Sequence, residues 1–115
     1  MNELNEEILN NVFFALSDPT RRGILKRVAR KPLSVNEIAE PYDMSLAAVS
    51  KHIQVLEKAE LISKEKQGRS YSCRMKFTSL EDASKLIQEY KQFWNERMDS
   101  LEKYLDNQQQ SKEKQ

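Results

Sequence analysis

The sequence predicts a mainly helical domain with one small β-ribbon, in the order α-α-α-α-β-β-α. Apolar residues recur at helical spacing through residues 3–58 and again through residues 80–105, whereas between these stretches they alternate with polar residues. The three prolines and Gly68 stand near the limits of these segments. We expect residues 1–106 to form the domain and the polar residues 107–115 to form a disordered tail.

The first two helices are expected at residues 3–16 and 19–30. The apolar stripe of the first helix consists of Leu4, Ile8, Leu9, Val12, Phe13 and Leu16. Asp18 is placed as an N-cap and Pro19 as the first helical residue, a combination that begins a helix cleanly. In the second helix the residues expected to face inward are Ile24, Leu25 and Val28. Two roles stay open for the arginines near its start, a phosphate contact and an inter-helix salt bridge. These arginines are Arg21 and Arg22.

A short third helix is expected to begin at Ser34, which forms a capping-box pattern with Glu37, and to end before Pro41. Ser45 is placed to cap a fourth helix that continues to Lys58. At about 100° per residue, the apolar positions of this fourth helix fall within one narrow arc that should face the core. These positions are Leu46, Val49, Ile53 and Leu56.

From Leu61 the apolar period changes to two, which predicts two short strands joined by a turn at residues 66–69. A two-stranded ribbon is marginally stable alone, so it must pack against the helices. A long helix is then expected from Leu80 to Leu105, about 39 Å at a rise of about 1.5 Å per residue. Its apolar positions are Ala83, Leu86, Ile87, Tyr90, Phe93, Trp94, Met98, Leu101 and Leu105.

Length and composition are those of a soluble single-domain protein. The chain has 115 residues, 38% of them hydrophobic and 32% charged. Its longest apolar run, residues 12–16, is far too short to span a bilayer, so no membrane association is expected. Acidic residues stand at the N-terminus where a signal peptide carries basic ones, and a single cysteine excludes an internal disulfide. We therefore expect a cytoplasmic protein in which Cys73 packs within the ribbon rather than acting as a redox switch.

Charge is distributed unevenly along the chain, although the formal net charge is only +1. Residues 1–18 contain four acidic and no basic side chains, and residues 77–106 contain seven acidic and four basic ones. The middle, residues 19–76, contains thirteen basic and six acidic side chains. A basic middle between two acidic ends is the distribution expected when one surface of a protein binds a polyanion.

The third and fourth helices form a short angled pair followed by a β-ribbon, which is the pattern of a winged helix-turn-helix. In that fold the second helix of the pair enters the DNA major groove with its first residues toward the base edges. Small side chains, hydroxyls and bases suit this position, whereas acids do not. Residues 45–51, SLAAVSK, have this composition, and the next acid along the helix is Glu57. The sequence therefore predicts binding to an operator in double-stranded DNA.

Contacts with DNA are expected from the start of the fourth helix and from the ribbon. The base edges are expected to be read by Ser45, Ala47, Ala48 and Lys51. The alanine methyl groups can contact thymine methyl groups directly. Ser50 and His52 are placed near phosphates, and Arg69 at the ribbon tip is placed to reach the minor groove. The expected set also contains Gln54 and Lys66.

His52 is the one histidine of the chain. A catalytic base needs a nucleophile, and a metal ligand needs further ligands, and the local sequence supplies neither. We therefore expect His52 to contact phosphate or to pack between helices. No motif pairs a nucleophile with a base or cradles a phosphate, so we expect neither enzymatic activity nor a cofactor.

Three segments carry a resemblance to a known family. The segments FFALSDPTRRGILKRV, LSVNEIAEPYDMSLAAVSKHIQVLEKAELI and FWNERMDSLEKYL resemble bacterial transcriptional repressors of the ArsR/SmtB type, from about Val12 to Leu105. The resemblance implies a winged-helix homodimer that binds an operator and represses transcription, usually until a small effector binds. It also implies that the first and last helices form the dimer interface.

A second subunit is also expected from the length of the last helix and from its aromatic stripe. The expected interface residues are Ile8, Val12, Ile87, Tyr90, Phe93, Trp94, Met98 and Leu101. A two-fold dimer would bind a pseudo-palindromic operator with half-sites about one helical turn apart, or a multiple of that. A pocket for an unidentified organic effector at this interface stays open.

The chain departs from the family pattern at two places. Residues 33–44 contain no cysteine and residues 80–105 no histidine, which argues against both of the metal sites that the family uses. Glu60 stands where the family usually has glycine, so this residue either adopts a left-handed conformation or the helix ends differently. One alternative function stays open, a winged-helix protein-interaction module without DNA binding, although the basic middle of the chain argues against it.

Overall fold

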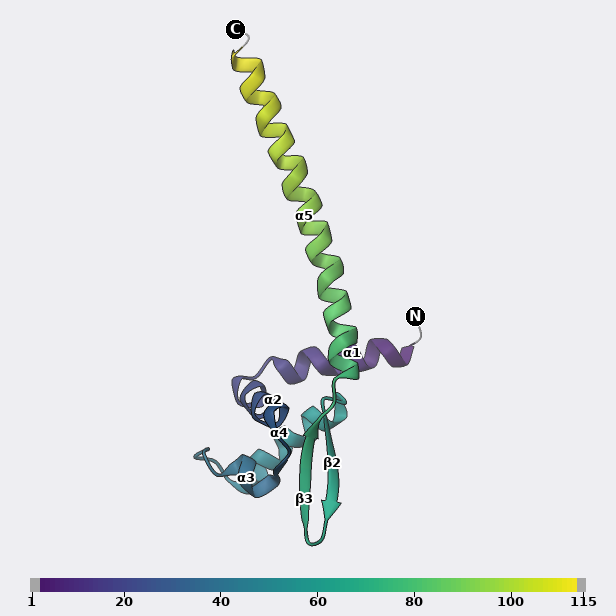
Figure 1. Ribbon diagram of the computed structural model, residues 1–115, viewed down its shortest axis with the longest axis vertical. Coiled ribbons are helices and arrows are strands. Elements are labelled where there is room, and N and C mark those ends of the chain that lie inside the picture. The colour runs from purple at the N-terminus through teal and green to yellow at the C-terminus, as the bar shows by residue number, and fades with distance from the viewer. Residues whose placement is uncertain (1–2, 114–115) are drawn as a thin grey trace. The chain divides into compact units, whose positions relative to one another are not determined.

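The computed structural model describes residues 3–113 and contains five helices and three strands in that range (Figure 1). The elements are α1 (Glu3–Leu16), α2 (Pro19–Arg30), β1 (Leu33–Ser34), α3 (Val35–Ala39), α4 (Leu46–Lys58), β2 (Ile62–Gln67), β3 (Ser70–Met75) and α5 (Thr78–Glu113). Contacts between residues divide the chain into a first unit that ends at Ala83 and a second unit that begins at Ser84. The predicted fold class, mainly helical with a winged helix-turn-helix order of elements, is confirmed.

One strand was not predicted. β1 is two residues long and pairs antiparallel with β3, so that Leu33 lies opposite Cys73 and Ser34 opposite Ser72. The sheet therefore has three strands in the order β1-β3-β2. Two residues are too few to show an alternating pattern in the sequence, so the strand could not be predicted from it. It forms through its pairing with β3.

The predicted helix starts are confirmed by their hydrogen bonds. The Asp18 carboxylate accepts from the backbone N–H of Arg21 at 3.0 Å, and Pro19 begins α2. Ser34 and Glu37 form the capping box of α3, in which each side chain accepts from the other residue's backbone N–H. The Ser45 hydroxyl accepts from the N–H of Ala48 at 3.1 Å, at the start of α4.

The core of the first unit forms where α1, α2, α3 and α4 meet the base of the sheet. Its fully buried side chains include Ile24, Ile38, Ile53, Leu56, Leu61 and Ile62. The predicted inward stripe of α4 is confirmed at Val49, Ile53 and Leu56 but is wrong at Leu46, which is 51% exposed. Leu46 is the first residue of α4, and it lies beside Val35 and Tyr71 rather than over the core.

The ribbon is a regular antiparallel hairpin whose turn is shorter than predicted. Gln67 pairs with Ser70, so the turn itself consists of Gly68 and Arg69 alone. Gly68 has a φ of 64°, a conformation that glycine adopts without strain, and a glycine at this position is typical of a type II′ turn. Cys73 lies fully buried opposite Lys64, and burial raises the pKa of its thiol.

The chain leaves helix α4 through a left-handed backbone conformation at Glu60. This is one of the two alternatives that the sequence left open. Glu60 has a φ of 56°, and the N–H of Leu61 donates to the carbonyl of Leu56 at 2.9 Å, the pattern of a Schellman motif. The left-handed conformation costs about 1 kcal/mol relative to glycine. The buried Leu61 and Ile62 follow directly and hold the chain in this turn.

The long final helix spans 36 residues, about 54 Å, and passes from the first unit into the second. Ser79 and Ala83 are buried in the first unit. The helix continues through residues 107–113, so the prediction of a disordered tail is wrong for these residues; residues 114 and 115 lie outside the described range. Gln, Lys and Glu are good helix formers, and extending an existing helix avoids the cost of nucleation.

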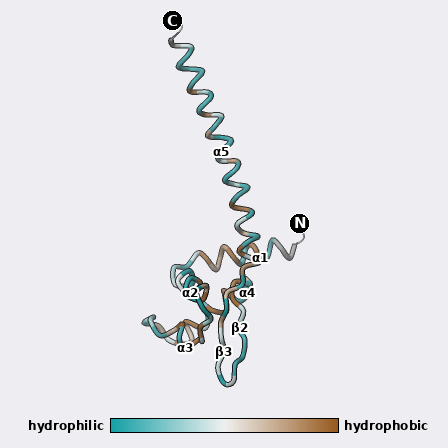
Figure 2. Tube along the Cα trace, viewed as in Figure 1, coloured by the Kyte–Doolittle hydropathy of each residue, from teal (hydrophilic) through white to brown (hydrophobic). Residues whose placement is uncertain are grey.

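Hydropathy varies turn by turn along α5 rather than in one long block (Figure 2). Within residues 3–113, no helix combines the length and the apolar character that a membrane span requires.

Two capping carboxylates should make the free energy of unfolding decrease at acid pH. The backbone N–H of Arg21 lowers the pKa of Asp18, and the backbone and hydroxyl of Ser34 lower the pKa of Glu37. A carboxyl group with a lowered folded pKa stabilises the fold above its unfolded pKa of about 4, and this contribution is lost as the pH falls further.

We expect the double variant Asp18→Asn, Glu37→Gln to remain folded at pH 7, because both amides can still accept the capping bonds. Its urea midpoint should fall less than that of the wild type between about pH 5 and pH 3. Glu65→Gln, at an exposed position of β2, is the matched control. Equal pH dependence of all three proteins would contradict the prediction.

Candidate nucleic-acid interface

The first two turns of α4 present a surface of small and basic side chains. Ser45, Ala47 and Lys51 are exposed, while Ala48 and Ser50 are half-buried beside them. Gln54 is exposed one turn further along the helix. Six of the seven α4 residues predicted to contact DNA therefore lie at or near the solvent, and none is acidic; the seventh, His52, is half-buried.

The ribbon brings one of its two predicted contact residues next to α4. Arg69 borders a groove of about 270 Å³ that Leu46 and Ser50 of α4 also line. Lys66 is exposed on β2 but does not border this groove.

This groove, here called the α4–ribbon groove, is built from four separate segments. The residues that the sequence did not single out for this surface are Ser34, Val35, Asn36, Leu46, Ser70 and Tyr71. Lys64 of β2 completes the lining. The missed residues come from β1, α3, α4 and the ribbon, up to 37 positions apart, so that no local motif in the sequence joins them.

Arg21 takes the inter-helix role rather than the phosphate role. Its side chain is only 8% exposed, and it links α2 to α1 and α4. Nε donates to the carbonyl of Ala15 at 2.8 Å and Nη2 donates to the carbonyl of Phe14 at 2.9 Å. The guanidinium also lies 5.0 Å from the centroid of the Phe14 ring. The partners are carbonyl oxygens, so the expected salt bridge is replaced by charge-assisted hydrogen bonds.

His52 takes the helix-packing role that the sequence left open. Its Nδ1 lies 3.2 Å from Nη1 of Arg21. A guanidinium can only donate, so Nδ1 accepts and the neutral ring carries its proton on Nε2. His52 is half-buried and fixes α4 to the start of α2. Sequence reasoning missed this pair because the two residues are 31 positions apart.

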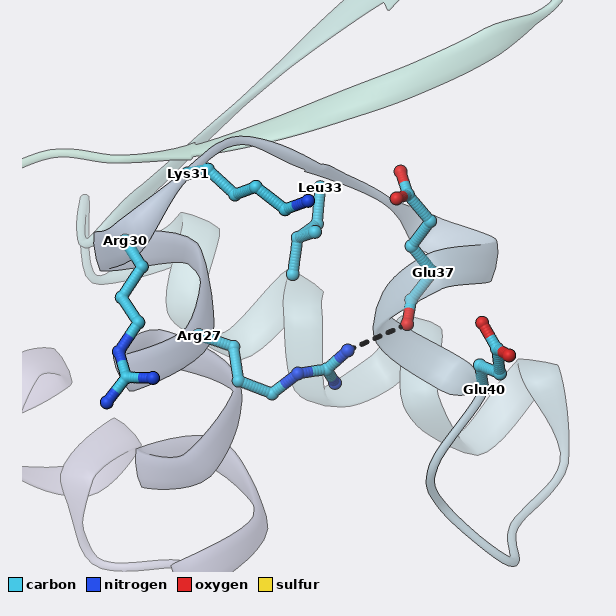
Figure 3. A pocket seen from close by; sticks show the side chains of 6 residues that line it. All are labelled: Arg27, Arg30, Lys31, Leu33, Glu37 and Glu40. Carbon is cyan, nitrogen blue, oxygen red and sulfur yellow. Dashed lines mark hydrogen bonds between the residues drawn. The ribbon is translucent and has the colours of Figure 1, made fainter.

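A second arginine of α2 holds the short helix α3. Nη1 of Arg27 donates to the carbonyl of Ile38 at 2.8 Å. Nη2 donates to the carbonyl of Glu37 at 2.9 Å, the bond drawn in Figure 3. Gly23 of α2 packs closely against the segment between α3 and α4. A Cβ at Gly23 would lie 3.0 Å from the Tyr42 hydroxyl. Arg27 and Gly23 together fix the turn of the helix-turn-helix against α2.

The residues predicted to form a dimer interface separate into two groups. On α5, Ile87, Tyr90, Phe93, Trp94, Met98 and Leu101 all have exposed side chains in the single chain. On α1, Ile8 is half-buried, but Val12 is fully buried in the core of the first unit, so its assignment to an interface is wrong. The neighbouring Phe13 is 40% exposed instead. Helical spacing identifies an apolar face but does not say which edge of it meets the core.

Across residues 3–113, no three His, Cys, Asp or Glu side chains are grouped so that they could hold a metal ion.

Comparison with known proteins gives matches that agree with this geometry. A family model described as a helix-turn-helix domain matches residues 16–65. The chain is 37% identical over 75 residues to the transcriptional repressor SdpR of Bacillus subtilis (strain 168), across 65% of this chain and 83% of that protein.

Two solved structures are similar over most of the chain. One is described as the ArsR family transcriptional regulator RHA00566, with a TM-score of 0.74, 39% identity, and coverage of 78% of this chain and 93% of that one. The other is an ArsR-like transcriptional regulator from Rhodococcus sp. RHA1, with a TM-score of 0.70, 28% identity, and coverage of 84% and 91%.

The contacts of Arg21 predict a large effect of a conservative substitution. In Arg21→Lys the single ammonium cannot reach two carbonyls and His52 at once, so at least one contact that holds α1 or α4 to α2 is lost, and the buried carbonyl of Ala15 can be left without its donor. We expect the free energy of unfolding to fall by about 2–4 kcal/mol, measured by urea denaturation. Arg22→Lys is the matched control, because the Arg22 side chain is exposed and, among the described residues, donates a single hydrogen bond, to the carbonyl of Leu16. A loss below about 1 kcal/mol in both variants would contradict the assigned role.

Proposed function

The chain belongs to the ArsR family of helix-turn-helix transcriptional regulators, and from that premise we propose that it binds an operator as a homodimer and represses transcription. The single observation that carries this proposal is the acid-free start of α4, where small and basic side chains lie at the surface. Repression itself is proposed by analogy with SdpR, whose name describes a repressor.

Recognition is proposed to occur through α4 in the major groove. Ser45, Ala47, Ala48 and Lys51 would face base edges there, with Ser50 and Gln54 near the backbone. The exposure of these residues and the absence of acid among residues 45–51 support this orientation. Arg69 and Lys66 would contact DNA from the ribbon, and the net positive charge of residues 19–76 would strengthen the attraction.

The proposed contact of His52 with phosphate is limited to one of its two ring nitrogens. Its Nδ1 is used by Arg21, so only Nε2–H is free to donate to a phosphate. The contribution of His52 to binding would then depend on the Arg21 contact, which orients the ring.

The homodimer is proposed to form through α5. The apolar side chains from Ile87 to Leu105 fall within an arc of about 140° at about 100° per residue, and most are about half exposed. A contiguous apolar face of this width is unusual on a monomer and fits a helix–helix interface with a second copy. A two-fold axis would place two copies of α4 toward successive major grooves of a pseudo-palindromic operator.

We propose that regulation does not use a metal ion, because of the side chains that two segments contain. Residues 33–44 contain no cysteine, and residues 80–105 contain no histidine, so neither segment offers the usual soft or borderline ligands. The signal that would release the operator stays unidentified, and an organic effector is compatible with the proposal.

Ala48→Glu separates DNA recognition from folding. A glutamate three residues after the Ser45 cap completes a capping box, so the variant should be at least as stable as the wild type. It should nevertheless lose specific binding by at least about tenfold, because it turns an acid toward the groove. Binding is measured by fluorescence anisotropy on a duplex selected from a randomised library.

Ala29→Glu adds the same charge at an exposed alanine of α2 and is the control. Unchanged affinity of Ala48→Glu would refute the placement of α4 in the major groove. If the wild type selects no duplex even at low salt, the protein-interaction module becomes the favoured function.

Trp94→Glu tests the dimer. Trp94 is 65% exposed in the single chain and lies near the centre of the apolar arc, so a charge there should disrupt association. Sedimentation equilibrium should give twice the 13.5 kDa of the chain for the wild type and a lower mass for the variant. Asn95→Glu, at the next position but outside the arc, should leave the mass unchanged. A wild-type mass of one chain would rule out the homodimer.

A further inference from the structure

We propose that the α4–ribbon groove holds one deoxyribose-phosphate segment of the operator, clamped between the recognition helix and the ribbon. The proposal rests on the DNA-binding function above and adds to it a site in which Lys64, Leu46 and Tyr71 contact the sugar-phosphate backbone.

The groove has the polarity of a nucleic-acid backbone. Its apolar part consists of Val35, Leu46 and Tyr71, and its remaining lining is basic, hydroxyl or amide. Leu46 is 51% exposed and Tyr71 is 42% exposed, so large apolar surfaces stand open beside donors. A deoxyribose offers an apolar ring next to a charged phosphate, and both kinds of contact are common where proteins position DNA.

The charge of the groove favours an anion. Lys64 and Arg69 line it, and no acidic residue does. The acid of β2, Glu65, belongs to the other face of the ribbon, because successive side chains of a strand point to opposite faces. The face of the ribbon that carries Lys64 therefore has no acid, while Glu65 lies on the other face.

Lys64 is held in place before any ligand binds. Its Nζ lies 4.8 Å from the centroid of the Tyr71 ring, within the range of a cation–π contact. Lys64 is only half exposed, and its neighbour across the ribbon is the fully buried Cys73. A lysine with fewer free rotamers loses less entropy when it binds a phosphate.

The position of the groove favours a segment of a bound polymer. The groove lies between Ser50 of α4 and Arg69 of the ribbon, which are two predicted DNA contacts. A strand bound at both residues would pass over the groove.

The test compares charge on the two faces of the ribbon. Lys64→Ala removes a charge that lines the groove, and Arg74→Ala removes one from the opposite face, where Arg74 pairs with Ser63 in the register. Binding to the selected duplex is measured at several salt concentrations. We expect Lys64→Ala to reduce the slope of log affinity against log salt by about one, and Arg74→Ala to leave it unchanged.

Leu46 gives an independent test, because it carries no charge. Leu46→Ser should weaken binding about fivefold at every salt concentration without changing the slope, and Leu46→Met should restore wild-type affinity. Thermal unfolding of each variant checks that the fold is kept.

The possible outcomes test the groove proposal separately from the proposed DNA-binding function. If Ala48→Glu abolishes binding while Lys64→Ala and Leu46→Ser bind like the wild type, the groove is empty in the complex and the recognition helix stands. Equal losses in Lys64→Ala and Arg74→Ala would mean a general charge effect and would also overturn the groove. If the wild type selects no duplex, the DNA-binding function fails and the groove proposal fails with it.

Discussion

The buried guanidinium of Arg21 is the interaction on which the arrangement of the first unit depends. A helix that ends against another helix leaves carbonyl groups without partners, and burying them unsatisfied would cost about 1–3 kcal/mol each. The carbonyls of Phe14 and Ala15 lie in the last turn of α1, and both receive hydrogen bonds from Arg21; the carbonyl of Phe14 also accepts from Ser17. The third donor nitrogen reaches His52 of α4, so one side chain sets the positions of three helices.

The second helix repeats this arrangement two turns further along. Arg27 donates to the last carbonyls of α3, and the absence of a Cβ at Gly23 leaves room for Tyr42 in the turn that follows. Helix α2 therefore holds both partners of the helix-turn-helix without entering the proposed DNA surface itself. The orientation of α4 is set by the side-chain contact between Arg21 and His52 and by its buried stripe, whereas α3 is held by hydrogen bonds to its backbone carbonyls. A recognition helix needs this rigidity, because base edges are read by contacts with narrow geometry.

Two regions of the chain place different chemistry at the surface. The first unit presents basic, hydroxyl and small side chains on α4 and on the inner face of the ribbon. The second unit presents aromatic and aliphatic side chains along α5. The first suits a polyanion and the second suits another apolar face, which together agree with the proposed division between operator binding and association.

The sequence by itself determined the order of the predicted elements and the capped starts of α2, α3 and α4. It also determined the buried positions Val49, Ile53 and Leu56. These features follow from caps and periodicity, which act over a few residues. The residues of α4 that are proposed to face DNA were chosen from composition in the same way. Only the tertiary structure decided the features that need distant partners. Strand β1 exists through its pairing with β3, Arg21 is buried because α1 and α4 converge on it, Val12 faces the core, and Leu46 turns toward the ribbon. Periodicity assigns a side chain to a face of its own helix, but the neighbour that covers that face is set by segments far away in the chain.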